Sequence, residues 1–310
     1  MPGRVVVEAG SRLHAGFYMV DASKGLWGSA GFYIASPRLV VEAWECGGEV
    51  LDAPGEYRGL IAEVLQALGA QGVCVRLHEA PPRHVGLGST TQASLAIAAA
   101  VAELRGEAFN PLEAARRLGR AKVSGVGTLL FKHGGFVADA GSPDPRGPRP
   151  LVRLSVPGWW RFIVLLPKAP RGPGEAEEEA RRLLEPRDPG RAGDIMARGL
   201  VRLASGVARE DLGAALEGLR LIQLGTGMYF SRLQGGVYRG DLARIVDEAS
   251  RNGMVLAQSS WGPTLYTITS VEDAAGDARL LKSICVEAGL ECRLVVAEPR
   301  NAGYKLRKTG

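Results

Sequence analysis

The sequence predicts an α+β protein whose helices and strands pack in two layers. With 310 residues, the chain is long enough for two domains or one large one, and for a sizeable buried core. Apolar residues make up 46% of it and charged residues 23%, close to the average of globular proteins, so disorder, collagen and disulfide scaffolds are excluded. Short runs rich in β-branched residues are interspersed with longer segments that have apolar residues at helical spacing.

In the first half of the chain, proline or glycine marks most of the expected boundaries. Gly69 and Gly106 are expected to end two helices, because glycine favours the position that follows a helix. The expected helices span residues 59–68, 91–104 and 112–118. The expected strands span residues 5–8, 38–44 and 73–78, and residues 131–140 are typical of a strand and a turn.

The second half is expected to contain several helices and few strands. Residues 141–150 are rich in proline and glycine, so they form either a loop or a domain linker. After them, helices are expected at residues 175–184, 195–208, 212–222, 242–250 and 274–288. Strands are expected at residues 161–166, 264–268 and 291–297. This order of elements favours α+β.

The chain is basic, with a net charge of +5 and a pI of about 9.1. Arginine suits the recognition of phosphate and carboxylate groups. The basic residues are spread along the chain rather than blocked, which disfavours nucleic acid as a partner. The four cysteines show no Cys-x-x-Cys spacing, so no zinc site is indicated, and no apolar run is long enough for a signal or a membrane span. We therefore expect a cytoplasmic protein with reduced thiols and no membrane partner.

A glycine-rich turn, His84-Val85-Gly86-Leu87-Gly88-Ser89-Thr90-Thr91, lies between an expected strand and an expected helix. Its glycines permit close approach of the backbone to a ligand, and the N-terminus of the following helix suits a phosphate or pyrophosphate. The turn is neither a Walker A loop nor a Rossmann glycine motif. The alternative is an ordinary helix start that is capped by serine or threonine.

Two further clusters of small residues lie in the chain. Ala121-Lys122-Val123-Ser124-Gly125-Val126-Gly127-Thr128 is followed by Lys132-His133-Gly134-Gly135-Phe136 and then by Asp139. Gln258-Ser259-Ser260-Trp261-Gly262-Pro263-Thr264 stands just before an expected strand. Each cluster is also compatible with simple turn chemistry.

These three clusters, in this order and at these separations, resemble the GHMP kinase superfamily. The turn at residues 86–90 resembles its central phosphate-binding motif, and residues 260–264 resemble its C-terminal glycine-rich motif. The resemblance implies a two-domain GHMP kinase-like fold. Residues 1–155 would form an N-terminal ribosomal-S5-like domain, and residues 156–310 a C-terminal ferredoxin-like α/β-plait domain.

Within that superfamily the sequence most resembles the archaeal β-ribofuranosylaminobenzene 5′-phosphate synthases. Residues 11–17, 84–92, 124–128 and 134–139 carry this likeness, together with Trp261. The resemblance implies decarboxylating C-ribosyl transfer from phosphoribosyl pyrophosphate to 4-hydroxybenzoate or 4-aminobenzoate, in methanopterin-type cofactor biosynthesis. It also implies Mg²⁺ on the pyrophosphate and a homodimer. Between the two acceptors the sequence does not choose.

The residues that carry the resemblance are assigned roles as follows. Arg12, His14 and Lys122 are the expected catalytic residues. The expected pyrophosphate site consists of His84, Gly86, Leu87, Gly88, Ser89, Thr90 and Thr91. The expected substrate-binding residues are Ser124, Gly125, Gly127, Ser260, Trp261, Gly262, Pro263 and Thr264. Asp139 is the candidate metal ligand, because magnesium usually takes one or two carboxylates besides substrate phosphates.

Two alternatives of other kinds are kept. One is an ATP-dependent small-molecule kinase of the same superfamily. Mevalonate-type kinases place an aspartate two residues after the Ser-Gly pair, where this chain has Gly127, which cannot accept a proton. The other is an RNA-binding module, for which the basic pI is the only support, because no run of interleaved basic and aromatic residues is present.

Overall fold

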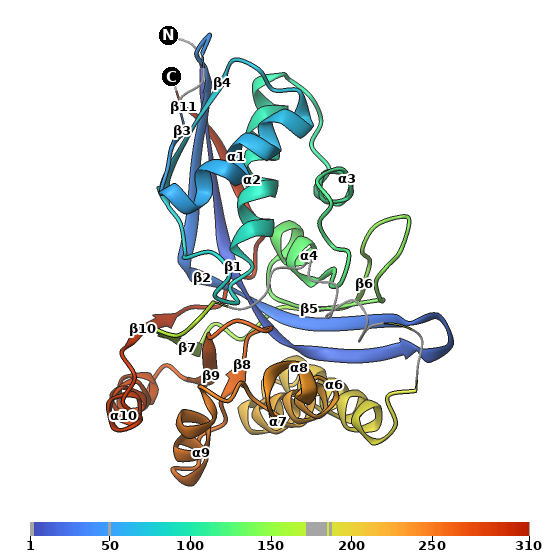
Figure 1. The fold of residues 1–310 in the computed structure, drawn as a ribbon, viewed down its shortest axis with the longest axis vertical. Coiled ribbons are helices and arrows are strands. Elements are labelled where there is room, and N and C mark those ends of the chain that lie inside the picture. Colours follow the sequence, from blue (N-terminus) through green and yellow to red (C-terminus); the bar gives the residue numbers. More distant parts are fainter. Residues whose placement is uncertain (1–2, 49–50, 172–184, 186–187, 310) are drawn as a thin grey trace.

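The structure, a computed structural model, describes residues 3–48, 51–171, 185 and 188–309 (Figure 1). Its first two strands, β1 (Arg4–Asp21) and β2 (Leu26–Glu45), form a long antiparallel hairpin that passes from one half of the molecule into the other. Near the chain termini the hairpin is the centre of a sheet with the order β11-β1-β2-β4-β3. In this order β3 is Leu51–Asp52, β4 is Val73–Glu79 and β11 is Lys305–Thr309. Farther along, β2 pairs with β5 (Phe136–Asp139), which pairs with β6 (Pro150–Leu154). The hairpin therefore connects the two halves.

The hairpin changes direction at irregular pairings. The register of β1 against β2 shifts between Ala9 and Ser11, between His14 and Gly16, and between Met19 and Asp21. Extra residues of this kind bend a strand and increase its twist. Figure 1 shows the result, because the two strands descend beside the helices of the first half and then turn to run over the helices of the second half.

Four helices cover one face of the first sheet: α1 (Gly55–Leu68), α2 (Ser89–Leu104), α3 (Pro111–Arg117) and α4 (Val126–His133). Helix α2 is buried on almost all sides and is rich in alanine. Its small side chains let the helix approach both the sheet and its neighbours closely, so it forms the centre of this core together with the apolar face of β4 (Val73–Glu79).

The second half is built on an antiparallel sheet of four strands in the order β10-β7-β9-β8. Its strands are β7 (Trp160–Pro167), β8 (Ala257–Gln258), β9 (Leu265–Ser270) and β10 (Cys292–Ala297). Helices α9 (Ala243–Arg251) and α10 (Ala274–Glu287) pack on one face around Ile163 and Leu165. Two helices, α6 (Arg191–Ala208) and α7 (Leu212–Tyr229), pack against the hairpin and against the other face of the four-stranded sheet. The short helix α8 (Ser231–Gln234) follows them.

Most of the expected elements are confirmed, and the main errors have physical causes. Residues 126–133 form a helix that the sequence analysis missed, since Gly127 and Thr128 weaken its helical pattern. Residues 141–150 are a loop between the paired strands β5 and β6 and no linker between domains. The last strand, β11 (Lys305–Thr309), pairs with β1, so the C-terminal residues return to the first sheet. The helix expected at residues 175–184 lies outside the described residues.

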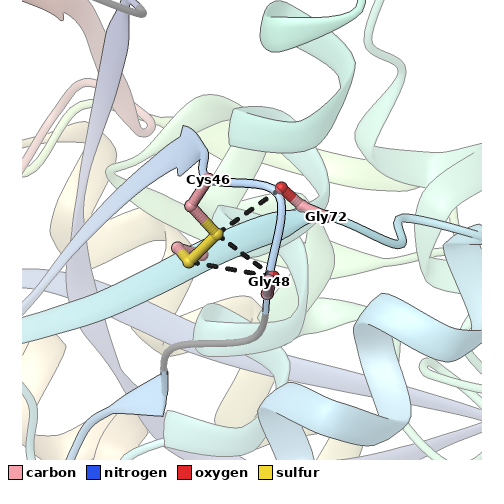
Figure 2. Close-up of a disulfide and its surroundings, with 4 residues drawn as sticks. Cys46, Gly48 and Gly72 are labelled. Carbon is pink, nitrogen blue, oxygen red and sulfur yellow. Dashed lines mark hydrogen bonds between the residues drawn. A yellow bond between two sulfur atoms is a disulfide. The ribbon is translucent and has the colours of Figure 1, made fainter.

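The expectation of reduced thiols is wrong, because the structure pairs all four cysteines in two disulfides. Cys46 at the end of β2 is bonded to Cys74 of β4, with Cα atoms 5.9 Å apart. Figure 2 shows the carbonyl groups of Gly48 and Gly72 beside the Cys46 sulfur, at 3.1 and 3.6 Å. A disulfide sulfur has no proton to donate, so these are contacts rather than hydrogen bonds. Cys285 and Cys292 join α10 to β10 and are buried.

Neither disulfide was predicted, because sequence spacing does not reveal which cysteine side chains meet in space.

In the part of the chain that the structure describes, no helix is both long enough and apolar enough to cross a membrane.

Candidate functional site

A cavity of about 520 Å³ lies where the hairpin, the start of α2 and the loop before β9 meet. All three sequence clusters contribute to its wall. The residues of the expected site that line it are Arg12, His14, His84, Gly86, Gly88, Ser89, Thr90, Thr91, Lys122, Ser124, Ser260, Trp261 and Gly262. The structure therefore brings together segments that are more than 240 residues apart, as the hydrogen bond from the His14 amide to the Ser259 hydroxyl also shows (2.9 Å).

The glycine-rich turn ends in a helix start that has no side-chain cap. Gly88 is the residue before α2, has φ +69° in the left-handed region, and makes no capping hydrogen bond through a side chain. The alternative of a serine or threonine cap is therefore wrong. The first amide groups of α2, those of Ser89, Thr90 and Thr91, have no carbonyl partner within the helix. Because these residues line the cavity, their amide groups and the positive end of the helix dipole suit an anion there.

The glycine-rich turn is hydrogen-bonded to the loop that precedes β9 in the second half. The Ser259 hydroxyl donates to the carbonyl of Gly86 (2.6 Å), and the Thr264 amide donates to the carbonyl of Val85 (3.1 Å). A Cβ atom on Gly262 would stand 2.2 Å from the carbonyl carbon of Val85, so only glycine fits at this crossing. Pro263 and Thr264 lie behind the loop and support it, since neither lines the cavity.

Positive side chains surround the start of α2. Arg12 donates to the carbonyl of Gly86 (3.3 Å) and lies against Gly88. Lys122 lines the cavity, as do two arginines that the sequence analysis missed, Arg83 and Arg120. The one carboxylate in the described lining is that of Glu63, which pairs with Arg120 at 3.4 Å. The balance of charge around the cavity therefore favours an anion that carries several negative charges.

Both histidines of the site are held in the neutral form. Burial, with a smaller contribution from the charge of Arg12, lowers the pKa of His14 well below its usual value. Its Nε2 atom is buried and has no hydrogen-bond partner within the described residues. Burial also lowers the pKa of His84, with Arg83 as the next cause. His84 and Ser260 have φ of 61° and 58°, a strained backbone that is common at functional sites.

Aromatic side chains form another part of the cavity wall. Trp261 stacks on Phe17 with ring centres 6.1 Å apart and meets Phe230 edge to face at 5.6 Å. Arg239, held by Asp241, donates to the carbonyl of Trp261 (3.3 Å) and so fixes the loop that carries it. Trp261 is 8% exposed, so it is both a core residue and a wall of the cavity.

Asp139 lies beneath the cavity and does not line it. Its Oδ1 accepts hydrogen bonds from the amides of Ser29 (3.3 Å) and Gly141 (3.0 Å), and its Oδ2 accepts from the Ser29 hydroxyl (2.5 Å) and the Gly125 amide (3.0 Å). Burial raises the pKa of this carboxyl to about 6, although the hydrogen bonds act in the opposite direction. The Ser29 hydroxyl also bonds to that of Ser124 at 2.6 Å.

Magnesium does not fit at Asp139. All the lone pairs that a metal would need are used by protein donors, and the carboxylate is fully buried. Across the described residues, no group of three or more histidine, cysteine, aspartate or glutamate side chains is placed to hold a metal ion. The use of Mg²⁺ stays a prediction, and none of the described residues is assigned as a ligand of the metal.

Five other members of the expected site support the wall instead of lining it. The side chain of Leu87 belongs to the hydrophobic core. Gly125 donates its amide to Asp139, and Gly127 lies in the first turn of α4. Besides Arg83 and Arg120, the sequence analysis missed Phe17 and Val123. The signal for these four was their position, since each is within three residues of a residue that was chosen.

Comparisons with known proteins agree with this geometry. Residues 57–133 match the family model of the GHMP kinases N-terminal domain. Two curated relatives, from Archaeoglobus fulgidus and Methanothermobacter thermautotrophicus, are each 29% identical, and each match covers 96% of this chain and 97% of the relative. Residues 57–133 are therefore similar to the GHMP kinases N-terminal domain, and the whole chain is similar to these two relatives. Both relatives are named beta-ribofuranosylphenol 5'-phosphate synthase.

Solved structures of GHMP kinase superfamily proteins share the fold. Homoserine kinase from Cytophaga hutchinsonii superposes with a TM-score of 0.66 at 17% identity, covering 98% of this chain and 97% of its own. Mevalonate pyrophosphate decarboxylase from Streptococcus pyogenes superposes with a TM-score of 0.66 at 14% identity, covering 97% and 98%. The expected two-part α+β architecture is thereby confirmed.

Proposed function

We propose that this protein is a synthase that transfers ribose 5-phosphate to a benzoate with loss of CO₂. The donor is phosphoribosyl pyrophosphate, and the product is a β-ribofuranosyl-arene 5′-phosphate. The observation that carries the proposal is a cavity whose lining combines an uncapped helix start, four positive side chains and an aromatic wall. The names of the relatives specify a phenol product, so we propose 4-hydroxybenzoate as the acceptor.

The donor's pyrophosphate binds at the start of α2. The amide groups of Ser89, Thr90 and Thr91 and the guanidinium of Arg12 supply donors for its oxygens, and Lys122 adds a further positive charge. As the bond from C1 of the ribose to the pyrophosphate oxygen breaks, negative charge grows on the leaving group. Fixed donors and cations stabilise this charge in the transition state, which lowers the barrier.

The acceptor's ring lies along Phe17 and Trp261, where apolar surface excludes water from the reacting carbon. His14 lines the cavity and stays neutral, so it orients the acceptor by hydrogen bonding rather than by charge. The ring carbon that bears the carboxylate bonds to C1 of the ribose. Loss of CO₂ from the same carbon then returns an electron pair to the ring and restores its aromaticity.

The kinase alternative has less support. The position that corresponds to the catalytic aspartate of mevalonate-type kinases is Gly127, in the first turn of α4. The nearest buried carboxylate, that of Asp139, is enclosed by protein donors and does not line the cavity. Among the described residues, a substrate hydroxyl in the cavity therefore has no carboxylate in direct contact with it at this position, and Asp139 is reached only through the hydroxyls of Ser124 and Ser29.

The test is incubation of the purified protein with phosphoribosyl pyrophosphate, Mg²⁺ and carboxyl-labelled 4-hydroxybenzoate. We expect labelled CO₂ and pyrophosphate in equal amounts. Release of ADP from ATP with a hydroxylated substrate, without CO₂, would support the kinase instead. The dependence on Mg²⁺, the homodimer and the cytoplasmic location stay predictions. Titration with a chelator, sedimentation equilibrium and fractionation of the source cells test them in turn.

A further inference from the structure

A chain of hydroxyl groups connects the cavity to a buried carboxylate. Ser124 lines the cavity, and its hydroxyl lies 2.6 Å from the hydroxyl of Ser29. Ser29 donates in turn to Oδ2 of Asp139 at 2.5 Å. Because the Ser29 proton is given to Asp139, the Ser29 oxygen accepts the proton of Ser124. The Ser124 oxygen therefore faces the cavity as a hydrogen-bond acceptor.

The chain of hydroxyls ends beside the aromatic wall. Phe17 of β1 pairs with Ser29 of β2, and the next strand, β5, places Asp139 next to Ser29. Side chains of paired residues on neighbouring strands stand on the same face of a sheet. Phe17 and Ser124 also line the same cavity. A ring held against Phe17 thus lies in the same cavity as the Ser124 oxygen.

We propose that Ser124, Ser29 and Asp139 form a relay that takes the proton of the acceptor's phenolic hydroxyl and later returns it. The inference rests on the proposed function and adds a specificity-determining role for these three residues. Ser124 is the catalytic residue, because it touches the acceptor. Ser29 and Asp139 act through it.

The protons and electrons balance along this path. A phenolic hydroxyl is protonated at neutral pH, as that of tyrosine is. As the ring carbon bonds to C1 of the ribose and pyrophosphate leaves with the electron pair of the broken bond, the hydroxyl becomes a carbonyl. Its proton passes to Ser124, that of Ser124 to Ser29, and that of Ser29 to Asp139. When CO₂ leaves, the electron pair of the broken carbon–carbon bond restores the aromatic ring, and the proton returns to the oxygen.

The environment of Asp139 suits a group that takes up a proton for a short time. Its carboxyl is buried, with the Gly125 amide bonded to Oδ2 and Pro148 of the 141–150 loop packed on Gly125. The titratable group in contact with it is Tyr18, whose hydroxyl donates to the Asp139 carbonyl and whose own pKa is raised by burial. A carboxyl with a pKa of about 6 is ionised at neutral pH and is more basic than an ordinary aspartate.

The test compares two acceptors in each variant. 4-Hydroxybenzoate needs a proton acceptor, whereas 3,5-difluoro-4-hydroxybenzoate is more acidic and arrives largely as the phenolate. We expect Ser124→Ala to lower kcat/KM for release of labelled CO₂ from 4-hydroxybenzoate by about 100-fold, the low end of general-base effects. For the difluoro acceptor we expect less than about tenfold, because no proton has to be removed.

Ser29→Ala and Asp139→Asn should show the same contrast, which a loss of structure alone would not produce. The control is Ser94→Ala, because the Ser94 hydroxyl is buried in α2 and none of the described residues bonds to it. It should leave both rates unchanged. Equal fractional losses on the two acceptors in Ser124→Ala would overturn the relay. A wild-type protein that releases no CO₂ from either acceptor would overturn the proposed function, and the relay with it.

Discussion

The hydroxyl of Ser259 donates a 2.6 Å hydrogen bond to the carbonyl of Gly86 and accepts one from the amide of His14. One serine of the second half therefore joins the hairpin to the glycine-rich turn of the first half. The Tyr266 hydroxyl adds a bond to the carbonyl of His14 (3.2 Å). Because the wall of the cavity is assembled from these three segments, the geometry of the site depends on contacts between the two halves.

Substitution of Gly88 by alanine should weaken donor binding through contact with Arg12. A Cβ atom there would stand 3.1 Å from Cβ and Nε of Arg12, and φ is +69°. We expect the dissociation constant of phosphoribosyl pyrophosphate, measured by calorimetry, to rise at least tenfold. Gly106→Ala is the matched control, because Gly106 has φ +68° and nothing within 4 Å of its Cβ position.

Both variants should lose about 1–2 kcal/mol of stability from the left-handed backbone. Equal affinity of the two variants for phosphoribosyl pyrophosphate would contradict the assignment of the pyrophosphate site to the start of α2.

At Gly127 the structure predicts different outcomes for two substitutions. Gly127 is in α4, and a Cβ atom there would meet the side chain of Thr91 at an ordinary distance of 3.6 Å. Gly127→Ala should therefore fold and, because alanine favours helix, gain up to about 1 kcal/mol in free energy of unfolding. Gly127→Asp should raise KM for the benzoate, because the negative charge of the new aspartate near the cavity repels the carboxylate of the acceptor.

The measurement is KM for 4-hydroxybenzoate in both variants, with urea unfolding for stability. Gain of ATP-dependent phosphoryl transfer in Gly127→Asp would instead favour the kinase.

The buried neutral His14 should make stability depend on pH. Its pKa is lowered in the folded protein, whereas in the unfolded chain it is close to 6.5. As pH falls below 6.5, the unfolded state therefore binds a proton that the folded state does not, and the free energy of unfolding decreases by up to about 1.4 kcal/mol per pH unit. Above pH 6.5 this contribution is constant.

Urea unfolding of the wild type and of His14→Asn at pH 7.5 and about pH 5.5 measures the effect. The stability of the wild type relative to the variant should fall by about 1 kcal/mol between these conditions. A difference that is independent of pH would mean that His14 ionises normally in the folded protein.

The two disulfides should stabilise the protein against unfolding. The Cys46–Cys74 bond closes a longer loop than Cys285–Cys292, with sequence separations of 28 and 7. Loop-closure entropy predicts that the longer one contributes about 3–4 kcal/mol and the shorter about 2–3 kcal/mol. Unfolding with and without dithiothreitol, in the wild type and in Cys46→Ser and Cys285→Ser, should rank them in this order. Four titratable thiols in the unreduced protein would contradict both bonds.

Local sequence patterns predicted most of the elements that this structure contains. The expected end of α1 at Gly69 is confirmed, with φ +61° and two capping bonds from its amide. The glycine-rich turn was assigned to a phosphate site because glycine, serine and threonine before a helix have few other reasons to occur together. The Gly69 prediction succeeded because it depends on neighbours along the chain, whereas the phosphate site at the turn stays a prediction.

Helix α4 and the full length of the hairpin were missed because they depend on contacts between segments that are distant in the sequence. Residues 9–16 and 26–35 are small, polar and aromatic in irregular order, and their strand conformation is set by pairing with β5 and by packing on α6 and α7. Tertiary contacts of this kind override local propensity.

The sequence by itself determined the likeness to the GHMP kinase superfamily, the glycine-rich turn and the residue types of the site. Only the tertiary structure decided that Asp139 faces Ser29 and Ser124 rather than the ligand, that Arg83 and Arg120 join the cavity, and that all four cysteines pair. Hydrogen-bond partners, burial and pairing depend on which segments meet in space. Residue type determines which hydrogen bonds and charges a side chain can provide. Packing decides which other group it contacts.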